Sequence, residues 1–258
     1  MVFIEPAQLK IKEYNVKTEK WGDNKPIRIA LIADTHAIWP WMTEKRLKKI
    51  VHKTNNLNPD LILMLGDYVA THPFGIQPIA SKNLKVYEEF ESKCGTYSVI
   101  GNHDLHGSVG WLEALRAKKL NVLENKSIKI KCKDYTFWLG GLEDLWWQNS
   151  DVEKTLSDII DDEPIIIMTH NPDAFVNVPS KVAITVAGHT HAGQIKFPFI
   201  GAIKRVIPSK YGKRFIYGHI QEDGKDLIVS GGLGSTGIPA RLLNPPEIVL
   251  VTLQNTSE

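Results

Sequence analysis

The chain has 258 residues with 43% hydrophobic and 23% charged side chains, a composition typical of a globular protein with a substantial core. The formal net charge of +2 is too small to indicate nucleic-acid binding by itself. No apolar run approaches the ~18 residues of a membrane-spanning helix, and the first residues lack the pattern of a signal peptide, so we expect a soluble protein that is cytoplasmic or peripheral to a membrane.

The first third of the chain alternates strands and helices. Residues 9–17 alternate apolar and polar side chains, which predicts an edge strand, and the apolar run at residues 27–33 predicts a central strand. Apolar residues with helical spacing follow at residues 43–57, with Thr43 as the expected N-cap. A second buried strand, expected at residues 61–65, completes a parallel βαβ unit.

The alternation continues and then gives way to a tail rich in strands. Further helices are expected at residues 84–92, at residues 111–120 with a start near Ser108, and from a capping box at residues 150–153 to about residue 160. Further strands are expected at residues 96–100, 121–123, 127–131, 135–139, 164–169, 182–187, 227–230 and 248–253. Because no repeat or linker divides the chain, we predict one domain over residues 1–258, with a core at about 27–253 and an edge strand and lead-in at 1–26. The α/β pattern predicts a four-layer αββα sandwich of two mixed sheets.

Two cysteines, Cys94 and Cys132, have no spacing typical of a zinc site. They are compatible with a reducing compartment, with plain core positions, or with a disulfide between them. The sequence leaves these three interpretations open.

Side chains that can bind metals follow five of the expected buried strands. In chain order they are Asp34 and His36, Asp67, Asn102, His170, and the pair His189 and His191. Each one alone could be a helix cap, a turn residue or a hydrogen-bonded histidine. That explanation would have to hold at five strand ends, all at the carboxyl edge where sites in parallel sheets collect. Metal binding is therefore the better interpretation.

The histidine pair lies in the segment TVAGHTHAGQ, at residues 185–194. If this segment is extended, His189 and His191 point the same way and aim at one point beyond the strand. Seven candidate ligands are too many for one ion with an open position, and a carboxylate shared by two ions about 3.5–4 Å apart resolves the surplus. Oxygen and imidazole ligands without thiolate suit Mn²⁺, our first choice, or Fe, Zn²⁺ or Co²⁺.

These blocks resemble the signature of the calcineurin-like metallophosphoesterase superfamily. Its blocks DxH, GD, GNHD, a lone His and GHTH stand here in order at residues 34–36, 66–67, 101–104, 170 and 188–191. Asp67 is followed by Tyr68, Val69 and Ala70, without the arginine that the serine/threonine phosphatases have in this place. The GNHD block also ends in Asp104 rather than Glu. A protein phosphatase is therefore not expected.

A narrower likeness covers nearly the whole chain. The sequences HNPD at residues 170–173, GGLG at 231–234 and PPEI at 245–248, together with Arg241, look like a bacterial phosphodiesterase-like branch of the superfamily. That branch has membrane-associated members and includes one type of UDP-2,3-diacylglucosamine hydrolase. Ala192 stands where the branch often has Gly, a departure that leaves the ligands untouched.

The resemblance implies a role for each residue of the site. One metal would be held by Asp34, His36 and His191, and the other by Asn102, His170 and His189, with Asp67 bridging them. Two carboxylates against two divalent ions leave a charge of about +2, which attracts phosphate and activates water as hydroxide. His103 would lie over the leaving group as general acid, with Asp104 orienting it and favouring its charged form.

Two segments near the expected site suggest what it binds. The loop after His36 carries Trp39 and Trp41, and residues 194–219 hold six basic residues and no acidic one, with aromatic and aliphatic residues among them. Such a segment suits an anionic amphiphile or an anionic membrane surface. A loop that packs its apolar residues on the domain explains it equally well. The expected substrate contacts are Trp39, Trp41, His106, Lys196 and Arg241.

The leading hypothesis is a dinuclear metal-dependent phosphoesterase that hydrolyses a phosphodiester or pyrophosphate bond in an anionic, phosphate-containing small molecule or lipid. A lipid-linked or nucleotide-sugar substrate such as UDP-2,3-diacylglucosamine is our choice within it. The alternatives are a nuclease or phosphomonoesterase of the same superfamily and, from another class, a non-catalytic metal-binding scaffold. The weak charge argues against a nucleic-acid partner, and the complete ligand set argues against the scaffold.

Overall fold

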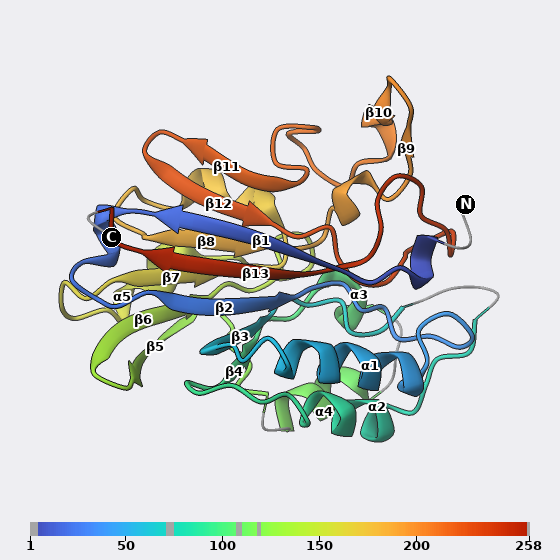
Figure 1. Ribbon diagram of the computed structural model, residues 1–258, viewed down its shortest axis with the longest axis horizontal. Helices are drawn as coiled ribbons and strands as arrows, with labels where there is room; N and C mark the ends of the chain where they lie inside the picture. The colour runs from blue at the N-terminus through green and yellow to red at the C-terminus, as the bar shows by residue number, and fades with distance from the viewer. Residues whose placement is uncertain (1–4, 71–74, 107–109, 118–119, 257–258) are drawn as a thin grey trace.

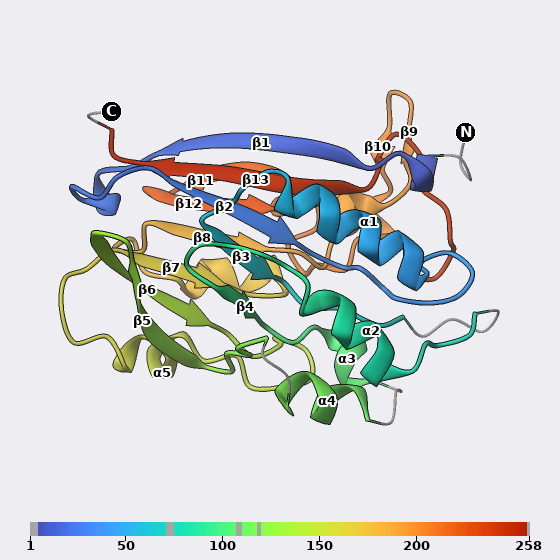
Figure 2. The same cartoon turned by 60° about the horizontal axis from the view of Figure 1, so that its bottom comes forward.

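The computed structural model describes residues 5–70, 75–106, 110–117 and 120–256, and two β-sheets packed face to face form its centre (Figure 1). Helices lie on the outer side of each sheet (Figure 2), which confirms the expected αββα layers.

The first sheet has the strand order β1-β13-β2-β3-β4. Its members are β1 (Lys10–Lys17), β13 (Glu247–Gln254), β2 (Ile27–Ile32), β3 (Leu61–Met64) and β4 (Thr96–Ser98). The strands β2, β3 and β4 run parallel, as the βαβ pattern predicted, and β13 lies antiparallel to β2. The N-terminal strand β1 is at the edge, as expected, and pairs with β13.

The second sheet has the strand order β11-β12-β8-β7-β6-β5. Its members are β11 (Gly218–Glu222), β12 (Lys225–Val229), β8 (Ile184–Ala187), β7 (Ile165–Met168), β6 (Tyr135–Gly141) and β5 (Lys126–Cys132). The four inner strands are parallel, and an antiparallel strand closes each edge. The buried strands in both sheets are short apolar runs, which is what burial on both faces requires.

The hydrophobic core lies in three layers. Ile29 and Leu63 from the first sheet meet Ile166 and Val186 from the second in the layer between the sheets. The opposite face of the first sheet is covered by α1 (Glu44–Asn55), α2 (Ala80–Tyr87) and α4 (Trp111–Ala117), whose apolar residues pack on Ile32 and its neighbours. The second sheet is covered by α5 (Val152–Ser157) and the 3₁₀ helix η3 (Pro172–Asn177).

Several element boundaries differ from the sequence prediction. The predicted N-cap Thr43 is confirmed, because its side chain accepts a hydrogen bond from the amide of Arg46. Helix α5 begins after Asp151 rather than at the predicted capping box, because the Asp151 side chain accepts from the amide of Lys154. Helix α2 begins and ends about four residues earlier than predicted, at Ala80 and Tyr87. The expected start near Ser108 lies outside the described residues. The region predicted as a strand at 121–123 forms only an isolated bridge.

A disulfide between Cys94 and Cys132 joins the two sheets. Cys94 precedes β4 in the first sheet, Cys132 ends β5 in the second, and their Cα atoms are 5.3 Å apart. The sequence leaves three interpretations of these cysteines open, and the structure shows a disulfide. Because disulfides persist mainly in oxidising compartments, these cysteines do not support a reducing one.

Among the residues described, no helix is long and apolar enough to cross a membrane.

Candidate dinuclear metal site

The seven predicted ligands meet at the carboxyl ends of the parallel strands. Strands β2, β3 and β4 of the first sheet and β7 and β8 of the second all end at this edge of the sandwich. The side chains that they deliver are all buried: Asp34, His36, Asp67, Asn102, His170, His189 and His191. Asn102 begins the short helix α3 (Asn102–Leu105), which the sequence did not predict. The structure thus brings together every predicted ligand.

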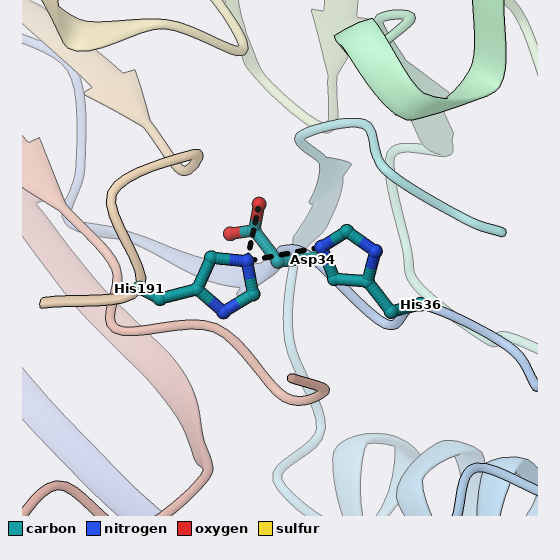
Figure 3. Close-up of side chains that lie close together, drawn as sticks. All are labelled: Asp34, His36 and His191. Carbon is teal, nitrogen blue, oxygen red and sulfur yellow. Dashed lines mark hydrogen bonds and ion pairs between the residues drawn. The ribbon is translucent and has the colours of Figure 1, made fainter. Parts of the chain in front are cut away.

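Asp34, His36 and His191 form the first cluster. Figure 3 shows the three side chains pointing toward one another. The Nε2 atoms of His36 and His191 are 3.0 Å apart, and Nε2 of His191 is 3.8 Å from Oδ1 of Asp34. Two imidazole nitrogens and a carboxylate oxygen within 4.8 Å of one another are a suitable ligand set for a divalent cation.

The second cluster contains Asp67, His170 and His189, with Asn102 beside it. His170 Nε2 lies 3.0 Å from both Nδ1 of His189 and Oδ1 of Asn102. The other ring nitrogen of His170, Nδ1, donates to the carbonyl oxygen of Leu65 at 2.7 Å. A backbone hydrogen bond of this kind fixes the tautomer of a metal-binding histidine, with the Nε2 lone pair facing the site.

Asp67 joins the two clusters. Its Oδ2 atom is 3.5 Å from Nε2 of His36 in the first cluster and 3.3 Å from Nε2 of His170 in the second. One carboxylate that reaches both sets of ligands is the arrangement needed to bridge two ions. The residues present therefore fit the two-metal site that the sequence predicted.

The ligands occupy unusual backbone conformations. Asp34, His36, Asp67, His189 and His191 all have φ between 46° and 70°. This left-handed region costs a non-glycine residue of order 1 kcal/mol or more and is typical of functional sites. The histidine segment is therefore a turn, with the 3₁₀ helix η4 at His191–Gly193. The expected extended geometry is wrong, and the turn directs His189 and His191 into different clusters.

Glycines make the close approach of these turns feasible. A Cβ atom on Gly101 would lie 2.3 Å from Oδ1 of Asp67, and one on Gly66 would lie 2.6 Å from the amide nitrogen of Gly101. Gly66 also has a φ of 88°. The two glycines of the GD and GNHD blocks therefore allow the β3 and β4 loops to touch at the bridging carboxylate.

Burial and neighbouring charges set the protonation of the ligands. Burial lowers the pKa of His36 and of His189 to about 3, which keeps both imidazoles neutral and able to bind metal. Burial raises the pKa of Asp34 to about 7. Burial opposes the charge of His170 as well, but the carboxylates of Asp67 and Asp34 raise its pKa to about 10. Without metal, His170 therefore keeps a proton whose positive charge compensates these carboxylates. A bound cation would compensate the same carboxylates in its place.

The predicted general acid His103 lies beside the two clusters. Its ring packs against that of His36 with centroids 4.8 Å apart, and its side chain is partly exposed. Its backbone amide donates to Oδ1 of Asp67 at 2.8 Å. Nε2 of His103 is 3.3 Å from the hydroxyl of Thr236, a residue that the sequence did not indicate. Gln194 holds Thr236 in place, accepting from its amide at 2.8 Å and donating to its carbonyl at 2.9 Å.

Asp104 occupies a different position from the one expected. Its two carboxylate oxygens accept from the backbone amides of Asp67, Tyr68 and Gly101 at 2.7–2.9 Å. Because these oxygens face backbone amides, Asp104 holds the turn that carries Asp67 rather than orienting the His103 ring.

A loop after β6 adds an aromatic wall that the sequence left unassigned. Asp144 accepts from the amides of Trp146 and Trp147 at 2.9 Å, and the Trp146 ring lies edge-on to that of His189 with centroids 4.5 Å apart. The centroids of the Trp147 and His106 rings are 3.7 Å apart, and His106 is exposed. Adjacent tryptophans at a strand end were the only sequence signal for this wall.

The other predicted substrate contacts are scattered. Trp41 lines a cavity of about 240 Å³ together with His36 and Thr236, whereas Trp39 is 58% exposed. Lys196 lies 4.6 Å from the centre of the Tyr217 ring.

Arg241 is fully buried behind the first cluster. Its guanidinium donates to the carbonyls of Gly231 and Gly234 and lies 3.3 Å from Nδ1 of His191. Arg241 therefore fixes the loops around His191. It does not reach the surface, so it is not placed for the substrate contact that the sequence predicted.

Comparisons with known proteins show which family this chain resembles. A sequence model described as Calcineurin-like phosphoesterase matches residues 27–193. The uncharacterized metallophosphoesterase YkuE of Bacillus subtilis is 30% identical over 99% of this chain and 89% of its own length. A transmembrane protein with metallophosphoesterase domain from Danio rerio is 27% identical over 95% of this chain, which spans 57% of that protein. A solved dimetal phosphatase from Danio rerio has a TM-score of 0.46 at 13% identity, covering 88% of this chain and 99% of that one.

The chain belongs to the calcineurin-like phosphoesterase family, since the family match spans more than half of its length. It is therefore a metallophosphoesterase, a hydrolase of phosphoric esters, and its two clusters are candidate ligands for a dinuclear metal site.

Proposed function

We propose that this metallophosphoesterase uses two metal ions, Mn²⁺ by preference, to hydrolyse a phosphodiester or pyrophosphate bond in a lipid-linked or nucleotide-sugar substrate. The observation that carries the catalytic part is the position of Asp67, whose Oδ2 lies 3.5 Å and 3.3 Å from the two histidines of opposite clusters. The ions would lower the pKa of water and compensate the charge of the phosphoryl oxygens.

The residues of the chain would bind the phosphate and donate a proton to the leaving group. The ligands would hold two positive charges at the strand ends, and these charges would attract the phosphate of the substrate. Hydroxide adds to phosphorus, the bond from phosphorus to the leaving oxygen breaks, and the leaving oxygen takes a proton. His103, partly exposed beside Asp67 and His36, supplies that proton from Nε2, and Thr236 holds the ring in position.

The lipid-linked substrate is supported by the rim of the site. Trp146, Trp147 and Trp39 are 47%, 57% and 58% exposed, and a groove lined by apolar side chains begins at His191. One relative is named a transmembrane protein with a metallophosphoesterase domain, so a domain of this kind occurs in a membrane protein. UDP-2,3-diacylglucosamine combines the acyl chains and the pyrophosphate that such a site suits.

The test is hydrolysis by the purified protein after metal removal and reconstitution. With Mn²⁺ it should cleave bis(p-nitrophenyl) phosphate, and UDP-2,3-diacylglucosamine and double-stranded DNA then distinguish the substrate classes. Absence of turnover with Mn²⁺, Fe²⁺, Zn²⁺ and Co²⁺, in protein shown to bind two metals, would reject the proposal. Faster cleavage of DNA than of the lipid would favour the nuclease.

A further inference from the structure

The exposed apolar side chains of this protein are concentrated at the end of the molecule that carries the metal site. Most of the large hydrophobic side chains that are exposed among the described residues lie in connections that follow the carboxyl ends of strands. These strands are β2, β3, β6, β8 and β12. Within the described residues, the exceptions are Ile11 and Ile160. Isolated exposed apolar residues need no explanation, but a concentration at one end marks an interaction surface.

The densest part of this surface is the segment 196–206, which we call the hairpin surface. It consists of β9 (Lys196–Phe197), β10 (Gly201–Ala202) and the 3₁₀ helix η5 (Lys204–Val206). Figure 1 shows the β9–β10 hairpin projecting from the body of the molecule. Phe199 is fully exposed and Ile200 and Val206 are 68% and 67% exposed. The alternative that this segment packs its apolar residues on the domain therefore fails for these three.

The exposed charged side chains in the segment around the hairpin surface are basic. Residues 194–219 contain no acidic side chain. Lys204, Arg205, Lys210 and Lys213 are all exposed, whereas Arg214 pairs with Glu222. Exposed apolar residues flanked by basic ones are the combination with which peripheral proteins bind anionic lipid surfaces.

A groove leads from the hairpin surface to the metal site. It encloses about 510 Å³ and is lined at its inner end by Thr190 and His191 and at its outer end by Phe197, Ile203 and Val206. Because His191 belongs both to the groove and to the first metal cluster, a phosphate at the metals and a hydrocarbon chain in the groove can belong to one molecule.

We propose that the hairpin surface docks on an anionic lipid bilayer and that the groove receives the hydrocarbon chain of an amphiphilic phosphate ester drawn from that bilayer. The proposal rests on the proposed function, because the ester is the substrate of the metal site. The bilayer is the occupant that the observations favour, since an anionic lipid surface matches both the exposed apolar side chains of Phe199 and Ile200 and the exposed basic residues beside them.

Vesicle flotation tests the docking step. The full chain loaded with Mn²⁺ should float with vesicles of phosphatidylcholine mixed equally with phosphatidylglycerol and stay behind with phosphatidylcholine alone. The double variant Lys204→Ala, Arg205→Ala should lose roughly thirtyfold in partitioning, given the usual contribution of a basic residue near an anionic surface. The double variant Phe199→Ser, Ile200→Ser should lose binding at all lipid ratios.

Matched controls come from the opposite end of the molecule. Lys181 and Ile160 are exposed and precede β8 and β7, at the amino ends of these strands. Lys181→Ala and Ile160→Ser should bind vesicles like the unchanged protein. Equal binding losses in hairpin and control variants would overturn the assignment of the surface. Metal content and melting temperature show that each variant is folded.

Turnover tests the groove and separates this inference from the proposed function. A long-chain alkyl p-nitrophenyl phosphate in anionic vesicles should be hydrolysed at least tenfold more efficiently than methyl p-nitrophenyl phosphate in solution, and Ile203→Asp should remove the advantage. If the protein hydrolyses the soluble ester but neither binds vesicles nor prefers the long chain, the docking proposal fails and the proposed function stands. If it hydrolyses neither ester, the proposed function fails, whatever the flotation result.

Discussion

Asp67 and His103 are tied together through the backbone: the amide of His103 donates to Oδ1 of Asp67 at 2.8 Å. The other oxygen of Asp67 faces His36 and His170 in the two clusters. The carboxylate proposed to bridge the two metals therefore also positions the backbone of the proposed general acid. Replacing Asp67 tests the metal-binding part of the mechanism, and replacing His103 tests the proton transfer.

Replacing Asp67 should remove both metal binding and turnover. We expect Asp67→Ala to retain fewer than two metals and to lose about a hundredfold to a thousandfold in kcat, the loss typical of removing one preorganised electrostatic contact. Elemental analysis and diester hydrolysis measure the two effects. Asp226→Ala is the matched control, since its carboxylate is buried but pairs with His219 away from the site. Two bound metals in Asp67→Ala would show that Asp67 is not the bridge.

Replacing His103 should lower turnover without removing metal. A general acid contributes about a hundredfold to ten-thousandfold, so His103→Gln should lose activity on esters with an alkoxide leaving group. Esters with a p-nitrophenolate leaving group need less proton donation and should lose less. His219→Gln, remote from the site, serves as the control. A loss of one metal in His103→Gln would instead identify His103 as a ligand, a role for which its position near His36 and Asp67 also qualifies it.

The sequence predicted the strands and the ligand set because both depend on local signals. Short apolar runs such as residues 61–65 have few alternatives to a buried strand, and polar residues at their carboxyl ends collect at one edge in any parallel sheet. The bridging position of Asp67 and the division of His189 from His191 followed from the resemblance and agree with the two clusters.

Other features of the site depend on contacts between distant parts of the chain. The left-handed conformation of Asp34 and His189 depends on the loops around them, because it is uncommon for any residue other than glycine, although Asp and His adopt it more readily than most. Asp104 could not be placed from sequence because its partners are the amides of residues 67 and 68 on another strand end. The contact of Trp146 with His189 likewise joins two strands of the second sheet.

Metal binding should release protons, and more of them at low pH. In the metal-free protein the pKa of His170 is raised to about 10 by the nearby carboxylates and that of Asp34 to about 7 by burial. Both groups bind metal only after losing the proton, so a fall in pH weakens binding. His170 contributes about one proton at pH 8, and Asp34 adds up to about one more below pH 7.

Calorimetry in buffers of different ionisation enthalpy measures this proton release. The number of protons released should rise as pH falls from about 8 to about 6, and Asp34→Asn should abolish the rise while it weakens binding. His36 and His189, with pKa of about 3, should not contribute in this range. A proton count that is independent of pH would contradict the assignment to Asp34.

Reducing the disulfide should destabilise the fold but leave the metal site intact. Cys94 and Cys132 are 38 residues apart, and closing a loop of this length typically stabilises a protein by about 2–4 kcal/mol through the unfolded state. Urea unfolding with and without reductant measures the difference, and the pair Cys94→Ala, Cys132→Ala separates the bond from its packing. Cys94 precedes the amino end of β4, and Cys132 pairs with the first residue of β6. The disulfide therefore lies at the opposite end of the sheets from the ligands, and metal content should not change. A stability that is the same in both redox states, or thiols that react freely in the folded protein, would show that the bond does not form in solution.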